Sequence, residues 1–178
     1  MLGFDFSGIP MHPLVVHFPV VLTVLLPISA LIALWAIRKG TTPRKAWALP
    51  LAMAAALAVS AWVATETGEQ EEDRVEQVVV KRAIHEHEEA GERLLVLSGA
   101  LVLVAAAGLL PRTMGQAARI LTTAGAVGLV AAAVQVGHSG GELVYRYGAA
   151  SAYTDSTANG TVTTADAAAP REAAGGDR

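Results

Sequence analysis

The sequence contains no cysteine among its 178 residues. This absence excludes disulfides, thiolate nucleophiles and cysteine-ligated metals, so any metal or haem ligand must be His, Met, Tyr, Asp, Glu or backbone. Charge is also scarce, because Asp, Glu, Lys and Arg make up 16% of the chain, against about 25% in soluble domains. The net charge is -3, and no basic block of the kind that binds nucleic acid occurs. The composition therefore favours a membrane protein without a nucleic-acid partner.

Long apolar runs are what the sequence has instead. Crossing the hydrocarbon core of a bilayer, about 30 Å thick, takes about 20 helical residues. Four runs approach or exceed that length: residues 13–37, 47–65, 94–110 and 120–136. The first run lacks the basic segment and small-residue cleavage site of a signal peptide, so we interpret it as a retained span. Trp35, Trp47 and Trp62 lie near span ends, as in an interfacial aromatic belt.

Two segments lie outside the runs. Residues 69–92 are strongly acidic, with Val75 and Val79 at helical spacing. They form either an amphipathic helix on the membrane surface or an extension of the third span. Residues 149–178 are rich in Ala, Thr, Ser, Gly and Asp and are expected to form a disordered tail. The predicted fold is all-α: an integral membrane four-helix bundle over residues 1–148.

The short connections between spans indicate a topology. Residues 38–45 and 111–119 carry the Lys and Arg residues typical of cytoplasmic loops. Four spans then put both termini and the acidic segment outside, which for a bacterial inner membrane is the periplasm. All the histidines fall on that outer side: His12, His17, His85, His87 and His138.

The outer histidines predict a cofactor site, because neutral imidazole binds metals and haem iron. His17 lies about one turn inside the first span, where a polar side chain is costly unless it faces the bundle. We expect His17 and His138 to be the main ligands of haem b, or otherwise of a copper, zinc or iron ion. His85 and His87 lie about 200° apart on a helix, so only one of them is expected to join.

A metal ion without a porphyrin needs more protein ligands than haem iron does. The outer side offers a set of candidates: His12, His17, His85, His138 and Glu66. Gln135, Glu142 and Tyr145 share a face with His138 if the helix continues past Gly137, and they are candidates to orient an imidazole N–H. The zinc-hydrolase pattern HExxH is absent, and no nucleophile–base arrangement is evident, so hydrolysis is not expected.

Two functions remain open at this point, and neither requires the chain to be an enzyme. One is a redox module that exchanges electrons with a membrane or periplasmic partner. The other is a non-catalytic scaffold or accessory subunit of a larger membrane complex, in which the same histidines and glutamates form interhelical hydrogen bonds. A transporter is disfavoured, because no ionisable residue lies in the middle of a span.

Two motifs carry a family resemblance. HPLVVHFP at residues 12–19 and GHSGGELVY at residues 137–145 resemble predicted bacterial membrane proteins of the domain-of-unknown-function family twenty-two thirty-one. The resemblance covers residues 11–148 and implies a four-span membrane domain with a histidine before the third span. It implies no established activity, although the layout is similar to that of small membrane cytochromes. Members often carry a histidine two residues after Leu-Val-Tyr, where this chain has Tyr147.

Overall fold

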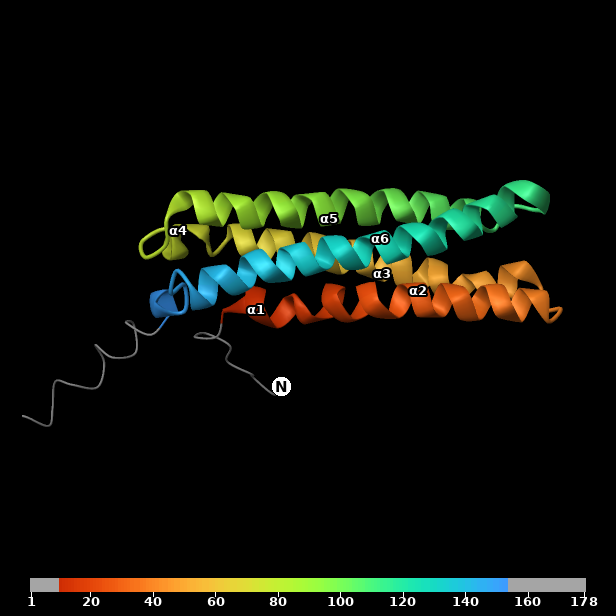
Figure 1. Cartoon of the computed structure of the whole chain (residues 1–178), viewed down its shortest axis with the longest axis horizontal. Helices are drawn as coiled ribbons and strands as arrows, with labels where there is room; N and C mark the ends of the chain where they lie inside the picture. The colour runs from red at the N-terminus through yellow and green to blue at the C-terminus, as the bar shows by residue number, and fades with distance from the viewer. Residues whose placement is uncertain (1–9, 154–178) are drawn as a thin grey trace, which may run out of the picture.

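The computed structural model describes residues 10–153, and its regular structure is helical throughout that range. The helices are α1 (Met11–Val15), α2 (His17–Arg38), α3 (Pro43–Glu69), α4 (Glu72–Val75), α5 (Lys81–Ala107) and α6 (Arg112–Tyr145). The four long helices run side by side along one axis, alternating in direction (Figure 1). The predicted all-α four-helix bundle is confirmed. Most of the predicted tail, residues 154–178, lies outside the described residues.

The outer surface of the bundle suits lipid rather than water. Four stretches are long and apolar enough to cross a membrane: Met11–Arg38, Pro43–Glu69, Lys81–Ala107 and Arg112–Tyr145. Large apolar side chains face outward along them, and Phe18 and Leu103 are 67% and 74% exposed. So much exposed apolar surface is unfavourable in water but not against lipid chains. The backbone polar groups of these helices are satisfied by hydrogen bonds within each helix, as a lipid environment requires. The chain is therefore a membrane protein with four candidate spans.

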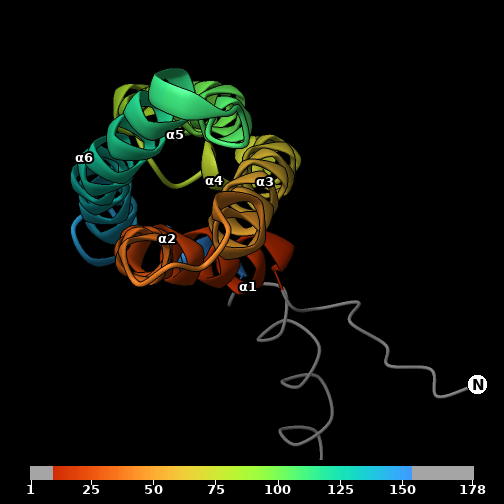
Figure 2. The same cartoon turned by 90° about the vertical axis from the view of Figure 1, so that its right-hand side faces the viewer.

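The long helices form a ring in which α2 and α5 occupy opposite corners. α2 packs against α3 and α6, and α5 packs against the same two helices (Figure 2). Small side chains allow this close approach of helix backbones. The central core consists of leucine and alanine: Leu26, Ala54, Leu57, Leu94, Leu101, Ala105, Ala126 and Leu129.

Local sequence explains where the helices break. Pro19 has no N–H to donate to the carbonyl of Val15, so the first apolar run divides at Val16 into α1 and α2. The glycines that follow Val136 do not interrupt α6, which continues to Tyr145. Of the two expected forms, the acidic segment takes the extension of the third span, since α5 begins at Lys81, and only the four-residue α4 lies between α3 and α5.

The two ends of the bundle differ in charge. Residues 7–65 and 94–141 contain no Asp or Glu, so the α2–α3 and α5–α6 connections carry only positive charge. We call this the basic end. The opposite end holds α1, α4, the start of α5 and the end of α6 (Figure 1), with the carboxylates of residues 66–92 and Glu142. We call it the acidic end.

Trp47 shows where the predicted aromatic belt is wrong. Trp35 and Trp62 are exposed as expected, but Trp47 is fully buried. Its indole N–H donates to the carbonyl oxygen of Ala105 over 2.9 Å. A Cβ atom at Gly108 would lie 2.3 Å from the indole nitrogen. The glycine on α5 therefore provides the space that lets Trp47 enter the bundle.

Candidate functional site

His12 of α1 and His87 of α5 face each other at the acidic end. Their ring centroids lie 6.1 Å apart, with the ring planes at 87°. Helix α1 packs against α3, and α5 also packs against α3, so the two imidazoles meet where these helices come together. Within residues 10–153, no group of three or more His, Asp and Glu side chains is arranged to hold a metal ion. The site is thus a pair of histidines.

Helix α3 positions His12. The Nδ1 atom of His12 lies 2.8 Å from the carbonyl oxygen of Ala64. Because a carbonyl only accepts, Nδ1 carries the proton and donates it, which leaves the lone pair on Nε2. Gly68 follows one turn later, where a Cβ atom would lie 3.2 Å from Cε1 of the ring. Glycine at this position lets the imidazole lie against the α3 backbone.

Helix α6 positions His87 in the same way. Nδ1 of His87 lies 2.9 Å from the hydroxyl oxygen of Ser139, and that hydroxyl donates its proton to the carbonyl of Val136 over 3.0 Å. The Ser139 oxygen is therefore the acceptor, so His87 is also protonated at Nδ1 with its lone pair on Nε2. A Cβ atom at Gly140 would lie 3.0 Å from Cε1 of His87. Both rings thus lie against a glycine of a neighbouring helix.

This shared arrangement has two chemical consequences. A histidine that binds a metal usually donates its other ring N–H to a protein acceptor, which fixes the tautomer and raises the basicity of the ligand nitrogen. His12 and His87 both meet that condition. The same hydrogen bonds also tie α1 to α3 and α5 to α6.

Three other predicted ligands lie on the surface. His17, His138 and Glu66 are all exposed. Nδ1 of His17 lies 3.3 Å from the carbonyl oxygen of Leu14, within the same turn of chain. His17 and His138, which the sequence indicated as the main ligands, are not brought together with the His12–His87 pair.

The structure separates His85 from His87. The His85 side chain is 72% exposed and lies 3.8 Å from Glu88 and 3.4 Å from Glu89, both on its own helix. His87 is the inward residue, as expected of only one of the two.

The residues expected to orient an imidazole are also displaced. Gln135 and Tyr145 are exposed, and Glu142 pairs with Arg146 at 3.1 Å. Ser139 takes that orienting role instead. Sequence reasoning missed it, although it stands next to His138 inside the second motif.

Glu71, in the turn before α4, joins the two ends of the described chain. Its carboxylate accepts the backbone N–H of Met11 over 2.9 Å and the hydroxyl of Tyr153. The Arg74 guanidinium lies 5.4 Å from the centre of the Tyr153 ring. Burial and the hydrogen bond to Glu71 raise the pKa of Tyr153 above its ordinary value. Because Met11 precedes His12, this network also anchors the turn that carries the first imidazole.

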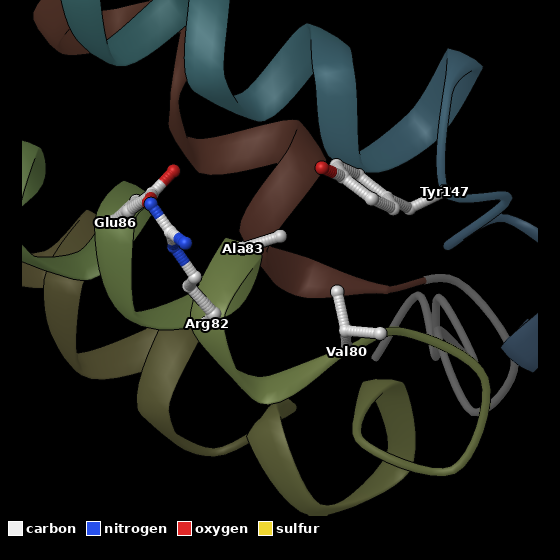
Figure 3. A pocket seen from close by; sticks show the side chains of 5 residues that line it. All are labelled: Val80, Arg82, Ala83, Glu86 and Tyr147. Carbon is white, nitrogen blue, oxygen red and sulfur yellow. The ribbon is translucent and has the colours of Figure 1, made fainter.

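A small pocket of about 180 Å³ lies at the start of α5 and is lined by Val80, Arg82, Ala83, Glu86 and Tyr147 (Figure 3). Arg82 donates to Glu86 over 2.9 Å, so the two charges neutralise each other. Tyr147 occupies the position where the family resemblance implies a histidine, and it lines this pocket rather than the histidine pair. We therefore assign the candidate site to His12 and His87.

Comparison with curated proteins found no match. Comparison with solved structures found none either. A family model described as "Predicted membrane protein (DUF2231)" matches residues 8–152. This range includes every helix of the bundle and both motifs, so the chain belongs to the DUF2231 family of predicted membrane proteins.

Proposed function

We propose that this protein is a membrane electron-transfer module that binds haem b through His12 and His87. The observation that carries the proposal is the spacing of the pair, whose ring centroids are 6.1 Å apart. If both imidazoles held one metal through bonds of about 2 Å, their centres would be about 6 Å apart, close to the observed spacing. The Nδ1 hydrogen bonds leave Nε2 of both His12 and His87 free to bind the metal.

The number of donors favours haem over a bare ion. A structural zinc ion takes four protein ligands and a catalytic one takes three, whereas the described residues bring only two imidazoles together. Haem iron already has four ligands from its own macrocycle and needs only axial ligands from the protein. Bound haem supplies one-electron exchange at the iron. The Ala64 carbonyl and the Ser139 hydroxyl would hold the imidazoles in the required tautomer.

The location follows from charge. The basic end would face the cytoplasm of a bacterial inner membrane, with both termini and the histidine pair on the periplasmic side. Electron exchange would then occur with a membrane or periplasmic partner. Reporter enzymes fused after Tyr153 test this orientation. A reporter that is active only in the periplasm should be active there, whereas activity of a reporter that works only in the cytoplasm would show the opposite orientation.

A second candidate function rests on the same hydrogen bonds. His12 links α1 to α3 and His87 links α5 to α6, as expected if the pair only holds a scaffold or an accessory subunit together. In that case the pair would matter for stability and for assembly with a larger complex. The two functions differ in whether the protein carries a cofactor.

An absorption spectrum distinguishes them. Detergent-purified protein, oxidised and dithionite-reduced, is expected to show a Soret band and sharp reduced bands, with about one haem per chain by extraction. His12→Ala and His87→Ala should each remove the bands. His17→Ala and His138→Ala are matched controls at exposed positions and should retain them.

Each alternative outcome is informative. Loss of the bands in His17→Ala and His138→Ala alone would move the site to those residues. Stoichiometric copper, zinc or iron without a Soret band would replace haem by a bare ion. A colourless, metal-free protein after supplementation would refute the proposal and leave the scaffold.

A further inference from the structure

We propose that an apolar groove between α5 and α6 at the basic end binds an anionic phospholipid, with its headgroup phosphate at Arg112. The proposal is independent of haem binding. It rests first on charge: five exposed cations lie at this end, Arg38, Lys39, Arg44, Lys45 and Arg112. None of them forms an ion pair with another residue in the described range.

The groove supplies a place for a lipid chain. It has a volume of about 590 Å³ and is lined by apolar side chains from α5 and α6. Leu103 and Leu121 lie at one end, and Leu110 and Met114 lie at the other, next to the α5–α6 turn. On α5 the groove wall runs from Leu103 to Ala107, where the helix ends, which is about 6 Å along the bundle axis. Leu110 follows in the turn. Ala107 keeps the groove open between Leu103 and Leu110.

Arg112 stands where a headgroup would lie. It does not itself line the groove, but in the sequence it falls between two residues that do, Leu110 and Met114. Its backbone is in the left-handed region, with φ of 61°. The α5–α6 turn, in which Arg112 has this conformation, is tight, because a Cβ atom at Gly115 would lie 1.9 Å from the carbonyl oxygen of Leu110. Arg119, about two turns further along α6, is buried and donates to the Gly108 carbonyl, so Arg112 is the exposed arginine at the start of α6.

Charge complementarity selects this occupant over a second copy of the chain. In a parallel dimer through the groove, Arg112 would lie beside the same residue of the partner, and residues 10–65 and 94–141 contain no Asp or Glu to offset the repulsion. A phosphate with apolar chains meets both requirements of the site. Anionic lipids are enriched in the cytoplasmic leaflet, and basic residues beside membrane helices recognise their headgroups.

Native mass spectrometry of the detergent-solubilised protein tests the proposal. Dioleoyl-phosphatidylglycerol and dioleoyl-phosphatidylcholine have the same chains and differ in headgroup charge. The adduct that survives the highest collision energy is expected to favour phosphatidylglycerol at least about fivefold, the effect of about one basic residue. Arg112→Gln should remove most of this preference. Arg44→Gln removes the same charge at the start of α3 and should retain the preference, since the α2–α3 connection lies on the opposite side of the bundle from the α5–α6 connection (Figure 2).

Filling the groove gives an independent test. Ala107→Phe should reduce retention of both lipids, while circular dichroism confirms that the variant is helical. Equal retention of the two lipids by the unaltered protein would overturn the proposal. So would equal effects of Arg112→Gln and Arg44→Gln, which indicate a diffuse surface potential. A dimer of the unaltered protein that Ala107→Phe converts to monomer, without changing lipid retention, would assign the groove to self-association instead.

Discussion

A methyl group added at Gly140 probes how His87 is held. Replacing glycine by alanine inside a helix ordinarily stabilises it by about 1 kcal/mol. At Gly140 the new Cβ atom would lie 3.0 Å from Cε1 of His87, so the ring must move by a few tenths of an ångström. That movement strains the 2.9 Å hydrogen bond between His87 and Ser139, and losing such a bond costs about 1 kcal/mol. The two effects should cancel, leaving stability unchanged.

Two neighbouring glycines of α6 provide matched controls. Gly137 and Gly141 have nothing within 4 Å of an added Cβ atom, so Gly137→Ala and Gly141→Ala should show the full gain. Gly140→Ala should therefore melt about 2–4 °C below both, since 1 kcal/mol corresponds to that shift in a chain of this size. The assay is thermal unfolding in detergent, followed by circular dichroism. Melting of Gly140→Ala at the temperature of the controls would refute the close packing of His87 on α6.

Three further predictions concern single contacts. Ser139→Ala removes the acceptor for His87 Nδ1 and should weaken haem affinity about 10- to 100-fold in a haem titration; an unchanged affinity would show that the hydroxyl does not orient the ligand. The pKa of Tyr153 is raised from 10.0, so the folded chain binds more protons above that pH, and stability falls as pH rises through it. The melting temperature of the unaltered protein minus that of Tyr153→Phe should therefore be constant below about pH 10 and decrease above it. An increase above about pH 10 would contradict a raised pKa of Tyr153. Trp47→Phe loses the buried hydrogen bond to Ala105 and should destabilise the bundle by about 1–3 kcal/mol, measured in the same unfolding assay against Trp62→Phe at an exposed position.

Much of the fold was predictable from short-range patterns. The four spans follow from the lengths of the apolar runs, and the break at Val16 follows from Pro19. The continuity of α6 through Gly137 and Gly140 was less certain, because glycine weakens a helix without ending it. The burial of Trp47 could not be predicted, since it depends on the space that Gly108 leaves on another helix.

The candidate site was predictable in its location but not in its members. All the histidines were expected at one end, and the pair that forms there comes from that set. The sequence indicated His17 and His138 because each stands at the edge of an apolar span. In the structure both are exposed, because the faces that α2 and α6 turn inward carry Thr23, Leu26, Ala126 and Leu129 instead.

The sequence by itself determined that this chain lies in a membrane, that it has four candidate spans, and that its histidines and the carboxylates of residues 66–92 lie at one end. These properties depend on the lengths of apolar runs and on the order of charges along the chain, both of which are readable in one dimension. Only the tertiary structure decided that His12 meets His87. That contact depends on how each helix is rotated, on α1 and α5 both packing against α3, and on Gly68 and Gly140, which let two imidazoles lie against neighbouring backbones.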